Sequence, residues 1–190
     1  MSAARSAAVN DADASSADLR AAFRELHGRR LHGFALLLTL GDRSLAGRLT
    51  AEALASGADR VEELRHPERA AAWLRARVVD HLPRRHEPPS PDEERAALDP
   101  LGVDRIVVDG LDALNPHERA ALVAADVERL DRGDVESVVG RRGAALDRLL
   151  TRARTRYLSA VGRSPIAPDR DIEAGLLVRR IRAVAARAMG

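Results

Sequence analysis

Cysteine and lysine are absent from this sequence of 190 residues, and aromatic side chains are scarce. Without cysteine the chain has no disulfides, thiolate nucleophiles or cysteine-ligated zinc fingers, and it fits a reducing cytoplasm. Because lysine is absent, all 31 basic residues are arginines. We interpret this usage as a coding bias, so a single arginine carries little information about function.

No stretch of the sequence is apolar enough for a signal peptide or a membrane span. The first 18 residues, MSAARSAAVNDADASSAD, contain no apolar core. The longest apolar run, FALLLTL, is far shorter than the roughly 20 residues that a helix needs to cross a bilayer. We therefore expect a cytoplasmic protein without membrane insertion.

Aromatic residues make up only 2% of the chain, whereas 45% of it is hydrophobic, mostly alanine, leucine and valine. Alanine and leucine are strong helix formers, while strands favour aromatic and β-branched side chains. The net charge of +2 argues against a wholly basic nucleic-acid coat protein. The expected fold class is all-α, with two small helical domains joined by a Pro-rich linker.

The first half of the chain predicts a disordered tail followed by a helical domain. Residues 1–15 are rich in alanine, serine and aspartate, and Ser16 is a candidate N-cap for a helix that starts at Ala17. The predicted apolar face of this helix comprises Leu19, Phe23, Leu26, Leu31, Phe34, Leu37 and Leu38. Two further helices, the last opened by Pro67 and stopped by Pro83, complete a domain over residues 16–83.

Residues 84–102 have the composition of a linker. The stretch PRRHEPPSPDEERAALDP, which starts at Pro83, holds five prolines among charged residues. Helical periodicity resumes over residues 103–160, although RIVVDG is also compatible with a short strand. We favour a helix there, because no second strand is available for pairing. Residues 161–190 predict a helical extension, either packed on the preceding domain or available to a regulator.

Residues 134–158, DVESVVGRRGAALDRLLTRARTRYL, predict a short helix, a glycine-containing turn and a longer helix. Asp131 is a candidate N-cap for the first helix, and Gly140 is its candidate stop. This is the helix-turn-helix plan, in which the second helix enters the major groove of DNA. Six arginines lie between residues 141 and 156 against one acid, Asp147. The solvated face of an ordinary helical bundle explains the same pattern equally well.

Side chains for catalysis or metal binding are not grouped in the sequence. The six histidines are scattered, and His27 and His32 are five residues apart, a poor spacing for one helix face. The stretch GRRGAAL follows a helix rather than a strand, so it is not a nucleotide-binding loop. We predict no metal, no cofactor and no enzymatic activity.

Several stretches occur in the order found in bacterial RNA polymerase sigma factors of the extracytoplasmic-function (ECF) type. FRELHGRRLHGFALLLTLGDRSLAGRLTAEAL is similar to the first two helices of that family's promoter-melting domain. PERAAAWLRARVVDHLPRR is similar to its tryptophan-containing helix. After the linker, residues 111–158 resemble the C-terminal domain through Leu114-Asn115-Pro116, Arg119, Gly140 and Arg152-Ala153-Arg154. The resemblance covers the chain from about residue 23 to residue 158.

Such a resemblance implies a protein that binds core RNA polymerase and promoter DNA to start transcription, and that has no catalytic residues. It implies an anti-sigma factor or other regulator as a further possible partner. Residues 56–65 and 73–85 would face the melted promoter strand. The residues that it assigns to the polymerase interface are Leu45, Arg48, Leu49 and Glu52. Those that it assigns to the upstream promoter element are Arg141, Arg142, Ala144, Ala145, Asp147, Arg148 and Arg152.

Four residues depart from the family's pattern at these surfaces. Arg48 and Ala51 stand where the polymerase-binding helix has acidic or glutamine residues, and Arg48 reverses the charge at its contact. Pro83 shortens the tryptophan-containing helix, and Asp147 stands where the DNA-reading helix has a basic residue. The alternative interpretation is a degenerate sigma-like protein that acts as a protein-interaction or regulatory module without promoter initiation.

Overall fold

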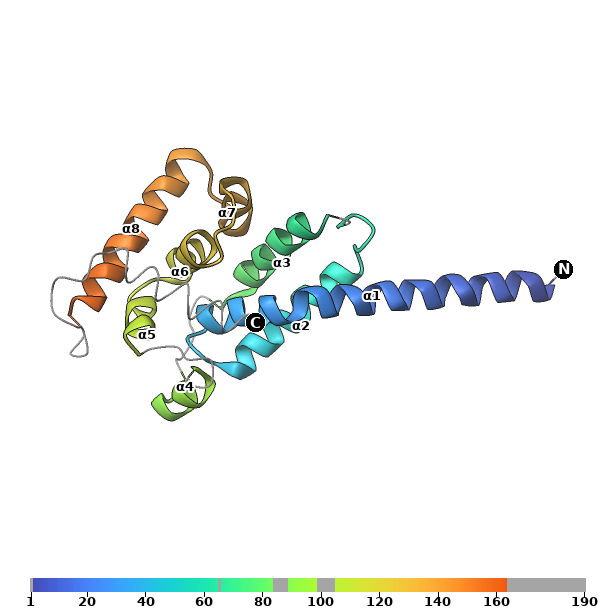
Figure 1. Ribbon diagram of the computed structural model, residues 1–190, viewed down its shortest axis with the longest axis horizontal. Helices are drawn as coiled ribbons and strands as arrows, with labels where there is room; N and C mark the ends of the chain where they lie inside the picture. Colours follow the sequence, from blue (N-terminus) through green and yellow to red (C-terminus); the bar gives the residue numbers. More distant parts are fainter. Residues whose placement is uncertain (1, 65, 84–88, 99–104, 164–190) are drawn as a thin grey trace.

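The computed structural model describes residues 2–64, 66–83, 89–98 and 105–163, with side chains from residue 17 onwards. Within these ranges the protein consists of eight α-helices and one π-helix, without a strand, which confirms the all-α class. The first helix projects as a single rod from the cluster formed by the others (Figure 1). The C-terminal extension predicted for residues 161–190 lies, beyond Arg163, outside the described ranges.

The first half of the chain contributes α1 (Ser2–Leu38), α2 (Arg43–Ala58) and α3 (Pro67–His81), which pack against one another. The Asp42 carboxylate accepts a hydrogen bond from the Leu45 N–H at 2.8 Å and so caps α2. Pro67 lies in the first turn of α3, as the sequence predicted. Helix α2 carries the candidate polymerase-binding residues, and of the stretches predicted to face the promoter strand, residues 65, 84 and 85 lie outside the described ranges.

Helix α1 begins at Ser2, where the sequence predicted a disordered tail and a helix starting at Ala17. Neither glycine nor proline interrupts the first 27 residues, and alanine is their commonest residue. Because alanine has the highest helix propensity, this stretch continues the helix that follows it. The low hydrophobicity that suggested disorder does not by itself break a helix.

The buried side of α1 is rotated relative to the predicted apolar face. Phe23 is buried, and a Cβ placed on Gly57 of α2 would lie 2.9 Å from its ring. Leu19 and Leu26 were expected on the same face, but they are 49% and 61% exposed. His27, the neighbour of Leu26, is buried instead. The neighbouring helices therefore cover the side of α1 that bears His27, and they leave both leucines open.

A short helix, α4 (Pro91–Leu98), lies within the stretch predicted to be a linker. Ser90 and Glu93 form reciprocal bonds at its start: the Ser90 hydroxyl accepts from the Glu93 N–H at 3.3 Å, and the Glu93 carboxylate accepts from the Ser90 N–H at 3.0 Å. Arg43 donates to the Ala96 carbonyl at 2.5 Å, which joins α4 to α2. The proline content was misleading because proline in a first turn opens a helix.

The second half contributes α5 (Arg105–Asp112), α6 (Pro116–Leu122), the π-helix η2 (Val123–Val127), α7 (Arg132–Val139) and α8 (Gly143–Val161). Helix α5 confirms that RIVVDG is helical. Gly110 of α5 lies so close to Tyr157 of α8 that a Cβ there would be 2.3 Å from the ring. The predicted single helix after Pro116 changes at Val123 into η2, where the Glu128 N–H donates to the Val123 carbonyl at 2.9 Å.

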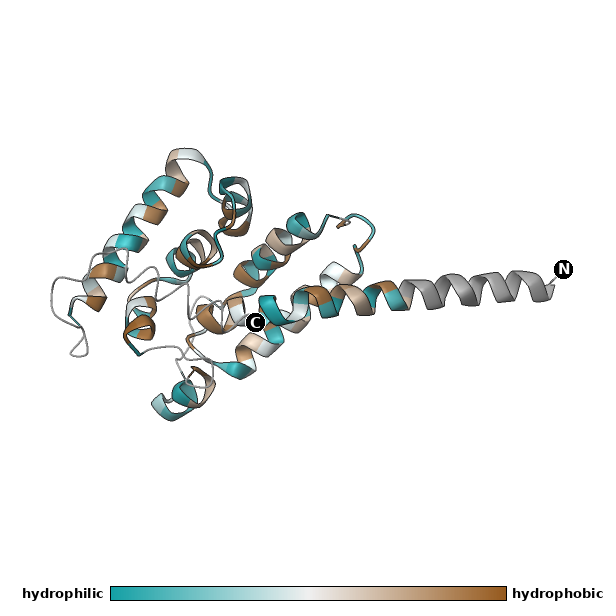
Figure 2. Ribbon diagram, viewed as in Figure 1, coloured by the Kyte–Doolittle hydropathy of each residue, from teal (hydrophilic) through white to brown (hydrophobic). Residues whose placement is uncertain are grey.

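The buried side chains of the two halves form one continuous hydrophobic core. Helix α3 packs against α7 and α6, and α1 also contacts α6. Hydrophilic and hydrophobic residues alternate along α8 (Figure 2). Two separate domains joined by a linker are therefore not confirmed.

Two buried arginines connect the halves. Arg75 of α3 donates to both carboxylate oxygens of Glu128, with Nη2 to Oε1 at 2.8 Å, and both side chains are buried. Arg119 of α6 donates to the carbonyls of Leu38 at the end of α1, Leu111 and Leu114. Burial lowers the pKa of Arg119 to about 10, so the guanidinium is still charged at neutral pH. These carbonyls surround a charge that would otherwise be costly to bury.

Candidate nucleic-acid interface

Helices α7 and α8 are joined by a tight turn, as the sequence predicted. The Asp131 carboxylate accepts from the Asp134 N–H at 2.8 Å and caps α7. Gly140 ends α7 in the left-handed region, at φ 62°, and Gly143 opens α8 at φ 51°. The inward faces of the two helices are apolar and comprise Val135, Val138, Val139, Leu146, Leu149, Ala153 and Tyr157. This packing fixes which side of α8 faces solvent.

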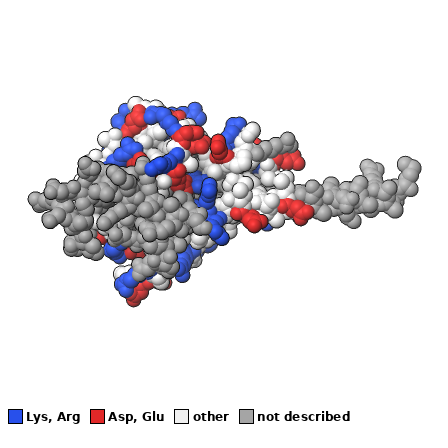
Figure 3. All heavy atoms as spheres, viewed as in Figure 1, with Lys and Arg blue, Asp and Glu red and all other residues white. Residues whose placement is uncertain are grey.

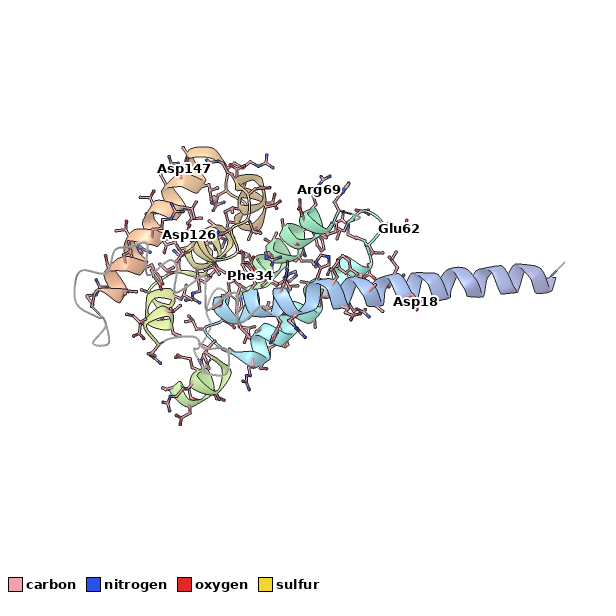
Figure 4. All side chains as sticks on the ribbon, in the orientation of Figure 1. Asp18, Phe34, Glu62, Arg69, Asp126 and Asp147 are labelled. Carbon is pink, nitrogen blue, oxygen red and sulfur yellow. The ribbon has the colours of Figure 1, made fainter. Side chains whose placement is uncertain are left out.

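A polar network holds the start of α8 against α7. Glu136 accepts from the Gly143 N–H at 3.0 Å, so it supplies the cap that a side chain at the start of α8 does not provide. Arg132 donates to both oxygens of Asp147, at 2.8 and 3.1 Å, and to the Gly143 carbonyl at 3.2 Å. The hydrogen bond from Arg132 lowers the pKa of Asp147. Figure 4 shows Asp147 on α8.

This network changes the interpretation of Asp147. From the sequence, Asp147 was expected to subtract one charge from a basic DNA-reading helix. In the structure the charge of Arg132, which lies outside that helix, offsets it. Arg132 was missed by sequence reasoning because it is 15 residues away from Asp147. Both side chains are exposed, so the pair adds little stability but fixes the orientation of Asp147.

Two of the six arginines between residues 141 and 156 are engaged with acids on other helices. Arg154 forms two bonds with Asp126, at 2.9 and 2.7 Å. Arg156 donates to Glu118 at 2.8 and 3.1 Å, and the Glu118 side chain is 2% exposed. The Arg154–Asp126 pair is bidentate, with one bond from Nε and one from Nη2, and is therefore stronger than a single bond. Arg156 uses Nη1 for both of its bonds. These two arginines therefore hold α8 against α6 and η2.

The other four arginines, Arg141, Arg142, Arg148 and Arg152, are exposed. Within the described ranges none of them forms an ion pair with a carboxylate, although Arg141 donates to the Gly140 carbonyl at 3.3 Å. Arg148 and Arg152 are four residues apart, so they lie one turn apart on one face of α8. Ala144 shares this face and is exposed, whereas Ala145 is half-buried. Basic and acidic side chains are interspersed over the visible surface (Figure 3).

The four residues predicted to bind polymerase do not share one accessible surface. Leu45 and Leu49 are buried in the core, whereas Arg48 and Glu52 are exposed. Arg48 donates to the Ser44 hydroxyl at 2.8 Å. The apolar face of an amphipathic helix is buried against the protein's own core when neighbouring helices are available. The protein's own core therefore covers both leucines in this conformation, and their assignment to a polymerase surface stays a prediction.

Trp73 lies half-buried on α3 within the stretch predicted to face the promoter strand. The guanidinium groups of Arg60 and Arg77 lie 5.6 and 5.8 Å from its ring centroid, within the range of cation–π attraction. This contact gives Arg77 a local role beside Trp73. Within the described part of the chain, α3 ends at His81, before Pro83.

Among the described residues, no set of three or more histidine and carboxylate side chains is placed to hold a metal ion. Of the helices that the structure describes, none has both the length and the apolar character needed to cross a bilayer. Comparisons with protein-family models, with curated proteins and with solved structures found no match to this chain. The resemblance to sigma factors therefore stays a prediction from motifs.

Proposed function

We propose that this protein is a sigma-like transcription initiation factor that contacts promoter DNA through α8. The observation that supports DNA contact is that some arginines of α8 are paired with acids and others are not. Arg154 and Arg156 are paired with acids, while Arg142, Arg148 and Arg152 are exposed and form no ion pair with a carboxylate among the described residues. Unpaired arginines on one helix face are suited to phosphate and to guanine, because the guanidinium offers paired donors.

The contacts between α7 and α8 support a helix-turn-helix interpretation. Helix α7 braces α8 through buried valines and through the Arg132–Asp147 and Glu136–Gly143 bonds. The major groove is wide enough for one helix, so α8 would enter it with Arg148 and Arg152 toward the bases or phosphates. Arg141 and Arg142, in the turn, would contact the flanking phosphates.

Fluorescence anisotropy with duplex DNA over a salt series tests this interface. Arg148→Ala and Arg152→Ala should each weaken binding by about 1 kcal/mol or more, roughly fivefold, and reduce the salt slope by about one counterion. Arg95→Ala on α4 is the matched control, since Arg95 lies on another helix and pairs with exposed Asp92. Affinity and salt slope that stay unchanged in both α8 variants would count against DNA contact through this face.

A second candidate is a regulatory module that keeps a sigma-like scaffold without promoter initiation. It is favoured by the burial of Leu45 and Leu49 and by the exposed positive charge of Arg48 at the expected polymerase surface. Arg48 would repel a basic partner surface that an acid attracts. The module would act through polymerase, through an anti-sigma factor or through another transcription protein.

A pull-down on core RNA polymerase followed by run-off transcription separates the two candidates. Polymerase binding together with promoter-dependent transcripts supports an initiation factor. Polymerase binding without transcripts, or no polymerase binding, supports the regulatory module. Arg48→Glu, which restores an acidic residue on the exposed side of α2, should strengthen polymerase binding in either case if this helix forms the contact.

A further inference from the structure

Two open cavities adjoin where α1 passes α3 and the segment between α7 and η2. One, of about 470 Å³, is lined mainly by apolar side chains, which include Leu19, Phe23, Leu26, Val61 and Leu64. The other, of about 790 Å³, lies between α1, α3, η2 and the start of α7. Leu26, His27 and Pro67 line both, so the cavities adjoin, and together they are here called the α1–α3 groove.

The apolar part of the α1–α3 groove exposes side chains that the sequence pattern would place in a core. Leu19 and Leu26 are two of the three large hydrophobic side chains exposed among the described residues. Figure 3 shows uncharged surface where α1 leaves the rest of the protein. Adjacent exposed leucines beside a hollow favour an occupant, because covering apolar surface is worth about 25 cal/mol per Å².

The rim of the α1–α3 groove is acidic. Glu62, Glu68, Asp131 and Asp134 line it, against two arginines that lack a carboxylate partner among the described residues, Arg30 and Arg129. Arg75 and Glu128 also line it, but they neutralise each other. Figure 4 shows Glu62 on the loop between α2 and α3, near α1. The groove therefore has a net charge of −2 and suits an occupant that is apolar on one side and basic on the other.

The chain carries such a segment after its last described residue. Residues 174–190, AGLLVRRIRAVAARAMG, contain four arginines and no acid. At helical spacing, Leu177, Ile181, Val184 and Ala188 share one face. Arg179 and Arg182 fall on the opposite face, and Arg180 and Arg187 flank the apolar one. Ten residues, 164–173, separate it from Arg163, and ten extended residues span about 33–36 Å. The segment thus matches the groove in its combination of apolar and basic side chains, and its tether allows it to lie up to about 33–36 Å from Arg163.

We propose that residues 174–190 bind in the α1–α3 groove of their own chain, with the apolar face against Leu19, Leu26 and Leu64 and the arginines toward the acidic rim. Helices of both halves line the groove, so the bound segment would hold the halves together and act as a regulatory element. This proposal goes beyond DNA binding and does not depend on it, since no residue of α8 lines either cavity.

Paramagnetic broadening in the full chain tests the proposal. Because the protein has no cysteine, Ala186→Cys gives a single attachment point for a nitroxide. We expect the amide signals of Leu19, Leu26, Val61 and Leu64 to lose most of their intensity, and those of Arg48 and Glu52 on the exposed side of α2 to keep theirs. No broadening, or broadening elsewhere, overturns the proposal.

Variants and mixing complete the test. Leu26→Arg removes an apolar contact and adds a repelling charge, so it should restore the groove signals, whereas Leu158→Arg, an exposed leucine of α8, should not. Ile181→Asp should restore them too, and it leaves the described core untouched. A mixture of nitroxide-labelled protein with unlabelled ¹⁵N protein should show no broadening; broadening there assigns the segment to a second copy and overturns binding within one chain.

Discussion

Replacing Glu128 by leucine should destabilise the protein more than any change to an exposed ion pair. The Arg75–Glu128 pair is buried at the junction of the two halves, where Arg75 donates to both carboxylate oxygens. Leucine has a similar volume but no acceptor, so the substitution leaves a buried charge without its counterion. Removing one partner of a buried pair typically costs about 3–5 kcal/mol.

The structure places the expected cost near the lower end of that range. Arg75 keeps a bond to the Ala71 carbonyl at 2.9 Å and a position 5.6 Å from the Phe34 ring centroid. Arg75 and Glu128 also line the larger cavity, through which water can reach the guanidinium. We therefore expect Glu128→Leu to lower the free energy of unfolding by about 3 kcal/mol.

Urea unfolding followed by circular dichroism and by Trp73 fluorescence measures this loss. Glu63→Leu, which breaks the exposed pair with Arg60, is the control and should cost less than about 1 kcal/mol. Arg75→Met combined with Glu128→Leu should recover most of the stability, because no charge is then left unpaired. A loss in Glu128→Leu no larger than in the control would refute the idea that the buried pair joins the halves.

Two further predictions concern the core and its histidines. Gly110→Ala should lower the free energy of unfolding, measured in urea, by about 1–3 kcal/mol, because the new methyl overlaps the Tyr157 ring. This loss is expected despite the better helix propensity of alanine. Tyr157→Leu should reduce the loss, and an unchanged stability in Gly110→Ala would contradict the packing. Burial, with Arg75 and Arg30 nearby, lowers the pKa of His27 below its usual 6.5, so the unfolded chain binds its proton first as pH falls. The contribution of His27 to stability should therefore be fully present above pH 6.5 and decline below it, until the pH falls past the pKa of His27 in the folded protein. His27→Gln should flatten this part of the profile of melting temperature against pH.

Local signals in the sequence predicted much of the helical framework. Asp131 and Gly140 bound α7 as expected, and Pro67 opens α3. Caps and prolines act within a few residues, so they can be recognised without knowing the fold. Composition alone did not predict α4, because the bonds between Ser90 and Glu93 start a helix within a proline-rich stretch.

The features that the sequence did not predict depend on contacts between residues that are far apart in the chain. Which arginines of α8 are available depends on Asp126 and Glu118, which lie 28 and 38 residues from their partners. The same holds for Leu45 and Leu49, whose burial depends on the packing of α1 over α2. A helical periodicity identifies an apolar face but not whether the protein itself or a partner covers it.

The π-helix η2 makes the chain sensitive to length at one place. It contains Asp126, which binds Arg154 of α8, and it is followed directly by Glu128, which binds Arg75 of α3. Each residue added to or removed from a helix rotates the residues after it by about 100°. An in-frame deletion of one codon within Val123–Val127 would turn these two carboxylates away from partners on opposite sides, whereas most substitutions there would leave their directions unchanged. Mutational tolerance in this segment should thus differ sharply between codon substitutions and codon deletions.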